Sequence, residues 1–400
     1  MTMRTPTHLF LAALTATGAA HAQYFEARNS AMGGVGTASS NYLAAGWGNP
    51  ALLTSCDESD DFGLILPAIG ARAYDETGLM EDIDNFVDAY SALDGNPNAT
   101  PQDYVDLGNR LLSLSGRRLN SELGGGLVLA LPSQTFGISL HARSYADLQL
   151  FTNIDPNDVN TIAAAPPGGA LPALSSEARI VGVGITEIGV SFARRFELAG
   201  LAVSVGVTPK YQRVDTYNYA VDADNFDAAN FDEDQFRSDE DGFNVDAGVA
   251  IEPGVPGLTI GVMARNLSRQ TFSTVGTAGA GFDYEITPQV AVGVAWELGA
   301  LTLAADVDAL PLERFDNDDL VAAGQSFVDD IQLLRFGAEF DVFGWLQLRG
   351  GYEHDLEDTL NGAISAGLGI SPFEVVRLDI AGTYVEGSSY GAVAQLSLTF

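Results

Sequence analysis

The sequence of 400 residues contains one cysteine, Cys56, and one lysine, Lys210. A single cysteine cannot close an intramolecular disulfide, and its position excludes both N-terminal lipid attachment and redox chemistry of the Cys-x-x-Cys type. Because basic residues are scarce, the formal net charge is −34 at pH 7. Nucleic acids are bound by placing Lys and Arg on phosphates, so we expect no direct nucleic-acid contact. The excess of acidic residues instead indicates a protein kept soluble by its charge or one adapted to a salt-rich environment.

The chain also lacks any run of about 18 apolar residues beyond its N-terminal segment, which excludes a membrane-spanning helix. Yet 46% of its residues are hydrophobic, and it has 44 glycines and 13 tyrosines. This composition is too apolar for a disordered secreted chain. The apolar surface must therefore be buried, either in a protein core or in lipid.

Residues 1–22 have the pattern of a secretory signal peptide. Arg4 precedes the apolar stretch Leu9 to Ala16, and the small residues of Ala20-His21-Ala22 form a cleavage site. A transmembrane anchor is the alternative, but the apolar stretch falls well short of the ~20 residues that a spanning helix needs. We expect Gln23 to begin the mature chain, which would be secreted to the periplasm.

Alternation with a period of two recurs through the C-terminal half in segments of about ten residues, the length of a tilted strand that crosses a bilayer. In residues 334–342 every second position is apolar, and the positions between them include Arg335, Glu339 and Asp341. Residues 376–384 repeat the pattern. Each of these strands has one face suited to lipid and one suited to water.

A soluble β-sandwich also alternates, and it is the alternative for every one of these strands. A sandwich has little reason to gather charges on one face in strand after strand, whereas a membrane barrel with a wet lumen does. The last segment, 390–400, ends in register on Phe400, which resembles the C-terminal insertion signal of outer-membrane barrels. We therefore expect a bacterial outer-membrane barrel whose partners are the insertion machinery, outer-membrane lipid and lipopolysaccharide.

Turn residues divide the chain into about fourteen strand candidates, an even number that suits a bacterial antiparallel barrel. Short connections such as 132–135 and long ones such as 152–177 and 223–241 are expected of periplasmic turns and extracellular loops, respectively. Gly344 marks another short turn, and residues 316–319 another loop. The candidates are residues 61–74, 121–131, 136–151, 178–197, 200–222, 242–252, 258–267, 287–297, 300–308, 332–342, 345–354, 362–370, 374–384 and 390–400.

A helical insertion at about residues 77–116 breaks the β pattern. Apolar residues recur there at helical spacing, and Thr100, Pro101 and Asp103 form a start signal for the second helix. We expect the two apolar stripes to pack on each other or on the barrel rim, with partner binding as the alternative. The stripes are Leu79, Ile83, Phe86, Val87, Tyr90 and Leu93, and Tyr104, Leu107, Leu111 and Leu114.

Residues 27–38 read ARNSAMGGVGTA, and residues 47–53 read WGNPALL. The pair resembles the N-terminal hatch of the long-chain fatty-acid transporter (FadL-like) superfamily, in which Met-Gly-Gly-x-Gly precedes Asn-Pro-Ala. Glycines permit tight turns in a crowded lumen, and proline fixes a bend. The alternative is a disordered glycine-rich lead-in. The resemblance implies a hatch at 23–60 and a barrel at 61–400. The matching residues are Met32, Gly33, Gly34, Gly36, Asn49, Pro50 and Ala51.

Residues 61–72 and 207–217, together with the acidic helical insertion, resemble the conjugal-transfer TraF-type family of barrels, from about Gln23 to the C-terminus. This resemblance implies a non-enzymatic envelope component of plasmid conjugation, with conjugation-apparatus proteins as partners. The wider superfamily implies the alternative, a passive transporter of a hydrophobic solute.

Enzyme and metal motifs are weak. Gly387-Ser388-Ser389-Tyr390-Gly391 matches G-x-S-x-G, but that motif acts on a strand-to-helix elbow and here we expect a hairpin turn. Beyond the signal peptide only His141 and His354 are available to a serine enzyme, and we expect both in the barrel wall or a loop. The acidic residues of 222–241 lack the order of an EF-hand, which favours a solvated loop over calcium binding. We expect no enzyme, no cofactor and no metal.

Overall fold

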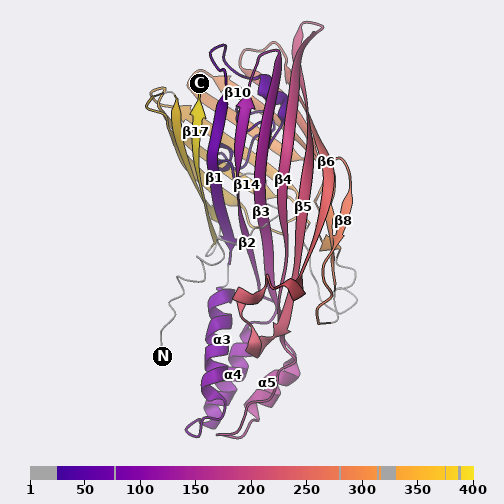
Figure 1. The fold of residues 1–400 in the computed structure, drawn as a ribbon. Helices are drawn as coiled ribbons and strands as arrows, with labels where there is room; N and C mark the ends of the chain where they lie inside the picture. The colour runs from indigo at the N-terminus through magenta and orange to yellow at the C-terminus, as the bar shows by residue number, and fades with distance from the viewer. Residues whose placement is uncertain are drawn as a thin grey trace.

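The computed structural model describes residues 25–400 except 76–77, 279–280, 313–314, 317–329, 374 and 386–388. The predicted signal peptide, most of the loop at 316–319 and the first residues of the G-x-S-x-G match therefore lie outside the described residues. The described chain forms a tall closed β-barrel, with helices gathered beyond one end (Figure 1). No helix in the described part of the chain is long and apolar enough to cross a membrane.

Fourteen antiparallel strands close the barrel, which confirms the predicted number. Each strand pairs with its neighbours in the barrel, and the first and last strands pair with each other to complete the wall. The barrel strands are β1 (Gly63–Tyr74), β2 (Arg118–Leu131), β3 (Phe136–Asn153), β4 (Glu177–Leu198), β5 (Leu201–Asp222), β6 (Arg237–Glu252), β7 (Leu258–Arg265), β10 (Gln289–Leu298), β11 (Leu301–Asp308), β13 (Leu333–Asp341), β14 (Leu346–Asp355), β15 (Ala363–Ile370), β16 (Val376–Val385) and β17 (Ser389–Thr399).

The alternation predicted from the sequence is the alternation of the wall. Phe336 and Phe340 of β13 are 47% and 48% exposed on the outside, whereas Arg335 and Arg349 are 3% and 5% exposed because they face the interior. Adjacent strands keep this register, since Arg335 pairs with Glu353 across β13 and β14. A wall that is apolar outside and charged inside is typical of a membrane barrel. It excludes the alternative of a soluble β-sandwich.

The two ends of the barrel differ, as the connection lengths predicted. One end has short turns, including residues 132–135 and the turn at Gly344, whose φ of 78° favours glycine. The other end carries the long connections, which contain α3 (Leu79–Leu93), α4 (Pro101–Ser113) and α5 (Pro156–Ala163). The loop predicted at 223–241 is shorter than expected, because β6 already begins at Arg237. The first five residues of this strand are all polar, so they do not show the alternation from which the other strands were predicted.

A second, three-stranded sheet lies in the long connections and was not predicted. It consists of β8 (Gln270–Ser273), β9 (Asp283–Ile286) and β12 (Phe315–Asp316). Strands of two to four residues are too short for alternation to stand out in a sequence. Aromatic residues of β8 and β9 pack on two valines and one isoleucine of β4 and on Val214 of β5, so these two strands cover one face of the long strands.

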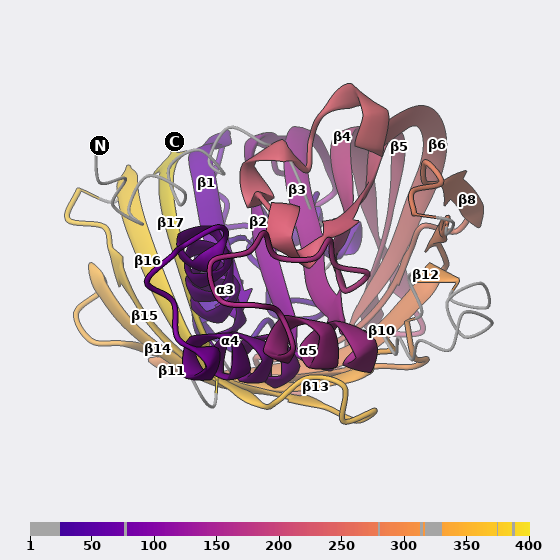
Figure 2. The same cartoon turned by 90° about the horizontal axis from the view of Figure 1, so that it is seen from below.

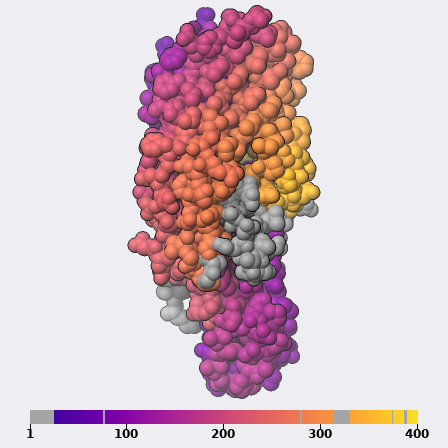
Figure 3. Space-filling view, turned by 90° about the vertical axis from the view of Figure 1, so that its right-hand side faces the viewer, coloured from indigo at the N-terminus to yellow at the C-terminus, as the bar shows by residue number. Residues whose placement is uncertain are grey.

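The helical module consists of α3, α4, α5 and three short 3-10 turns, η3 (Ala223–Asn225), η4 (Ala228–Asn230) and η5 (Asp234–Phe236). The predicted apolar stripes are buried on each other and on the extended ends of β3, β4 and β5. Thr100 and Asp103 cap α4 as predicted, since the Thr100 amide donates to the Asp103 carboxylate at 2.7 Å. The module projects beyond the barrel in Figure 3, and Figure 2 shows its helices in front of the barrel mouth.

Helix α3 is expected to be more stable in mild acid than at neutral pH. Partial burial, with repulsion from Asp88 and Asp227, raises the pKa of Asp84. A raised pKa in the folded state gives stability that is full below the unfolded pKa of about 3.9 and is lost as pH rises through the folded value. Hydrogen-exchange protection of α3, corrected for intrinsic rates, should therefore rise from pH 7 to pH 4.5, and Asp84→Asn should flatten the rise. A fall in protection would contradict this expectation.

Candidate functional site

The hatch, residues 25–60, is buried inside the barrel as far as Thr54, and residues 55–60 are exposed or half-buried. It starts with the buried helix α2 (Ala27–Ala31), whose first turn is capped because the Glu26 carboxylate accepts the Asn29 amide at 2.7 Å. Gly33 and Gly34 then take φ values of 72° and 81°, which end the helix and turn the chain. The Met-Gly-Gly stretch is therefore a helix stop inside the lumen.

The Asn-Pro-Ala motif begins the second short element of the hatch, η2 (Pro50–Thr54). The Asn49 side chain accepts the Ala51 amide at 3.1 Å, and its amide group donates to the Thr37 carbonyl at 2.8 Å. It also donates to the Val249 carbonyl of β6 at 3.1 Å. One asparagine thus caps η2, joins it to the glycine stretch and ties both to the wall.

Asp306 of β11 holds the middle of the hatch. One of its carboxylate oxygens accepts the amides of Gly36 and Thr37, each at 2.8 Å. The two amides point the same way because the chain turns after Gly34, so a single inward carboxylate satisfies both. Asp306 was not predicted, although an acidic residue at an inward position of a strand was a signal that could have identified it.

A buried ion-pair network joins α2 to the wall strands β13, β14 and β16. Arg28 binds Glu339 with two hydrogen bonds of 2.9 Å. Arg349 contacts Glu339 and Asp379, at 2.6 Å in each case. Because arginine presents donors in a planar fork, Arg349 connects two carboxylates that would otherwise repel each other. The alternation of residues 334–342 placed Glu339 on the face suited to water, but the sequence did not reveal its partner Arg28.

A second network lies under the other half of the hatch, on β3 to β6. Lys210, the single lysine, lies 3.0 Å from Glu187 and 3.0 Å from Asp246. Arg143 also pairs with Glu187 and donates to the Trp47 carbonyl of the hatch at 3.5 Å. The two networks show that charges in the lumen are paired where the hatch covers them.

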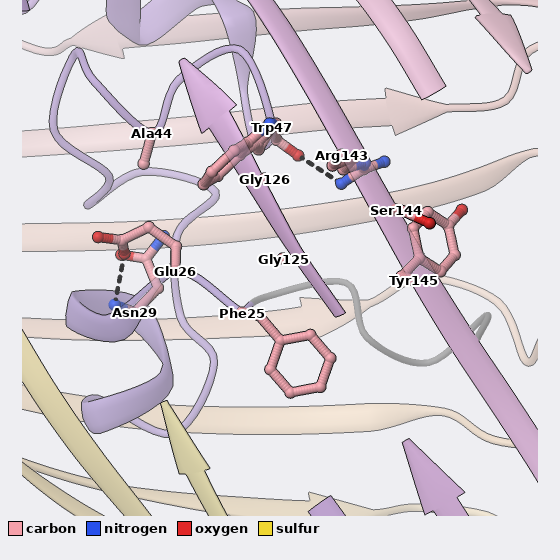
Figure 4. A pocket seen from close by; sticks show the side chains of 11 residues that line it. Phe25, Glu26, Asn29, Ala44, Trp47, Gly125, Gly126, Arg143, Ser144 and Tyr145 are labelled. Atoms are coloured by element: carbon pink, nitrogen blue, oxygen red, sulfur yellow. Dashed lines mark hydrogen bonds between the residues drawn. The ribbon is translucent and has the colours of Figure 1, made fainter. Parts of the chain in front are cut away.

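Cavities remain beside the hatch. One of about 370 Å³, counting its open mouth, lies between the hatch and strands β2 and β3, with Phe25 and Trp47 on one side and Arg143 and Tyr145 on the other (Figure 4). A second, of about 790 Å³ when the open solvent at its mouth is included, is lined by charged side chains of β1, β2, β11, β13 and β14. Its charged lining consists of Arg72, Glu122, Asp308, Arg335 and Glu353.

The two histidines lie far apart in the wall. His141 is buried on β3, and His354 is stacked on Tyr352 of β14 with ring centroids 6.4 Å apart. Ser389 begins β17 and is not on a strand-to-helix elbow. Among the described residues, no group of three His, Cys, Asp or Glu side chains has an arrangement that could hold a metal. Phe400 stacks on Phe62 with centroids 4.5 Å apart, and its role as an insertion signal stays a prediction.

Comparison with known proteins identifies the fold and the family. Among the solved structures that share the fold is the toluene transporter TbuX of Ralstonia pickettii, which is 13% identical over 97% of this chain and 100% of that chain, with a TM-score of 0.51. Another is the toluene transporter TodX of P. putida, which is 14% identical over 94% of this chain and 98% of that chain, with a TM-score of 0.50. No curated protein matches the sequence. The family described as "F plasmid transfer operon, TraF, protein" matches residues 46–308, which is most of the chain. The chain therefore belongs to this TraF family, and its barrel has the fold of these two transporters.

Proposed function

We propose that the protein is a non-enzymatic outer-membrane component of plasmid conjugation that acts by binding other envelope proteins. The family membership supports the process, and the barrel fold supports the location. We infer the mode of action from the helical module at the end of the barrel that has the long connections, because this module presents a folded surface beyond the barrel.

The lengths of the strands explain how the module is presented. Strands β4 and β5 each have 22 residues, whereas a tilted strand needs only about 9–11 to cross a bilayer. Their additional residues extend past the wall, where one face packs on the helices and the other packs on β8 and β9. A covered and therefore rigid extension is a suitable support for a protein-binding surface.

The lumen favours this function over solute passage. Small-molecule sites are mostly apolar with few polar groups. The larger cavity has many apolar side chains in its lining but also five charged ones, and the hatch crosses the lumen with both ends tied to the wall. Arg335 and Arg72 both pair with Glu353 in this cavity, at 3.6 Å and 3.2 Å. A hydrocarbon passing there would have to desolvate these groups.

The proposal is tested by a clean deletion in a conjugative host that carries this gene. Mating frequency should fall, and a plasmid-borne copy should restore it. Frequencies that stay unchanged in both donor and recipient deletions would contradict the role in conjugation. Mass spectrometry of gently extracted, tagged protein should identify stoichiometric transfer-apparatus proteins.

Passive transport of a hydrophobic solute is the second candidate, and a specific observation favours it. The smaller cavity shares Phe25 with the larger one. A third cavity shares Arg143 and Tyr145 with the smaller one and Gln289 and Leu312 with the larger one, so the three cavities adjoin one another beside the hatch. Toluene serves as the probe, because the solved structures above are toluene transporters. Saturable toluene uptake into proteoliposomes, together with a bound hydrocarbon and no protein partner, would support transport and reject the first proposal.

A further inference from the structure

Six barrel strands carry a glycine where the hatch crosses them. The strands are β5, β6, β7, β10, β13 and β14, which cover about half of the wall. The glycines form three pairs that face each other directly across neighbouring strands. Glycine within a strand weakens the strand and often marks the close approach of another backbone. The pairs are Gly206 with Gly248, Gly261 with Gly293, and Gly337 with Gly351.

The hatch backbone occupies the space that side chains would need at four of these positions, Gly206, Gly261, Gly337 and Gly351. At Gly248 the nearest atom is a side-chain oxygen of Asn49, and at Gly293 the space is taken by the side chains of Asp306 and Thr37. A Cβ atom on Gly351 would lie 2.0 Å from the Gly33 nitrogen, and one on Gly337 would lie 2.4 Å from the Met32 carbonyl oxygen. On the opposite part of the row, a Cβ on Gly206 would lie 2.4 Å from the Ala51 nitrogen. The contact is reciprocal, because a Cβ on Gly33 would lie 2.7 Å from the Phe336 oxygen of the wall.

Hydrogen bonds follow the same row. Asp306 accepts the amides of Gly36 and Thr37 beside Gly293, and Asn49 donates to the Val249 carbonyl beside Gly248. Ser365 of β15 accepts the Gly33 amide at 2.8 Å. The hatch from Gly33 to Ala51 is therefore hydrogen-bonded to the wall at each end and in the middle.

The contact with β1 and β2 is of another kind. The atoms nearest to Gly70, Gly124 and Gly126 include the rings of Phe25 and Trp47, which are side-chain tips that can rotate. The cavity of Figure 4 also lies on this side. The contacts of the hatch with β1 and β2 through these rings therefore differ from its backbone contacts with β5, β7, β13 and β14.

We propose that this row of glycines locks residues 32–51 of the hatch onto the wall strands β5, β6, β7, β10, β13 and β14, so that these residues move with the wall as one body. The hatch core then neither withdraws from the barrel nor unfolds to open it. Any displacement is restricted to the ring contacts of Phe25 and Trp47 with β1 and β2. This inference is independent of the role in conjugation, since a locked hatch is a property of the isolated barrel.

Hydrogen exchange of the intact purified protein tests the lock. The amides of Gly36 and Thr37 should exchange as slowly as those of β13 and β14. Gly351→Ala should speed exchange across residues 32–51 by roughly ten- to a hundredfold, because an extra methyl group in a well-packed site destabilises the packing by an amount that corresponds to about this change in the opening equilibrium. Gly350→Ala is the matched control in the same strand, since a Cβ there would have its nearest neighbour at 3.9 Å and exchange should not change.

The wild-type measurement alone can overturn the proposal, so it does not depend on whether Gly351→Ala assembles. Exchange of residues 32–51 at the rate of exposed loops, while β13 and β14 stay protected, would show a mobile hatch. Equal effects of Gly351→Ala and Gly350→Ala would show that the row of glycines does not lock it. A mobile hatch would leave the mating result untouched, so the two proposals fail separately.

Discussion

Replacing Arg349 by methionine is expected to lower the unfolding free energy of the barrel by about 3–5 kcal/mol, the range found when one partner of a buried ion pair is removed. The side chain has no exposed surface and lies 2.6 Å from both Glu339 and Asp379. Methionine fills the space but leaves two buried carboxylates close together, with Arg28 compensating only Glu339. A folded barrel migrates faster on a gel than the unfolded chain. When samples are heated to increasing temperatures before electrophoresis, the temperature at which the fast-migrating folded band disappears should therefore be lower for the variant.

Two further variants separate this effect from general damage. Arg213→Met removes an arginine whose side chain is 44% exposed and pairs with the exposed Asp239, and such a pair contributes at most about 1 kcal/mol. Its second contact, the buried Asp215 at 3.8 Å, keeps Arg237 as a partner at 2.6 Å. The double change Arg349→Met and Asp379→Asn also removes the carboxylate that Arg349 alone compensates, while Glu339 keeps its partner Arg28, so it should recover part of the loss. Equal melting of the Arg349 and Arg213 variants would show that the network does not stabilise the barrel.

The barrel could be predicted from one sequence because its signal is local. Residues 334–342 alternate without a break, and every second side chain in the wall faces lipid, so the pattern and the structure have the same cause. The helices at α3 and α4 were predictable for the same reason, as their apolar stripes are buried. Helix α5 was missed, although Asp155 accepting the Asn157 amide and Pro156 at the first position form a recognisable start.

The site was only partly predictable, because its contacts join residues far apart in the chain. The hatch motif identified Gly33 and Asn49, whose turn and capping roles depend on neighbours in sequence. Asp306 and its partner Gly36 are 270 positions apart in the sequence, and Glu339 and its partner Arg28 are 311 positions apart. The residues around each of them therefore do not indicate which residue it contacts. One signal was available: glycines at inward positions of strands, such as Gly337, indicate that another backbone lies against the wall.

Excision of the first two helices is expected to abolish conjugation while the barrel still assembles. Tyr74 of β1 lies directly opposite Asn120 of β2, so an Asn-Gly turn can join them in place of residues 75–119. The variant keeps all fourteen barrel strands, and β1 keeps its pairing with β17. Because the proposed partner surface is lost, mating frequency should fall to that of the complete deletion.

A matched excision at the same end of the barrel is the control for this result. Glu353 of β14 lies opposite Ala363 of β15, so a similar turn can replace residues 354–362 without touching the helical module. This variant should mate at the wild-type frequency, and both variants should give the heat-sensitive folded band of an assembled barrel. Normal mating by an assembled barrel without α3 and α4 would contradict a partner surface on these helices, because the wall and hatch alone would then suffice.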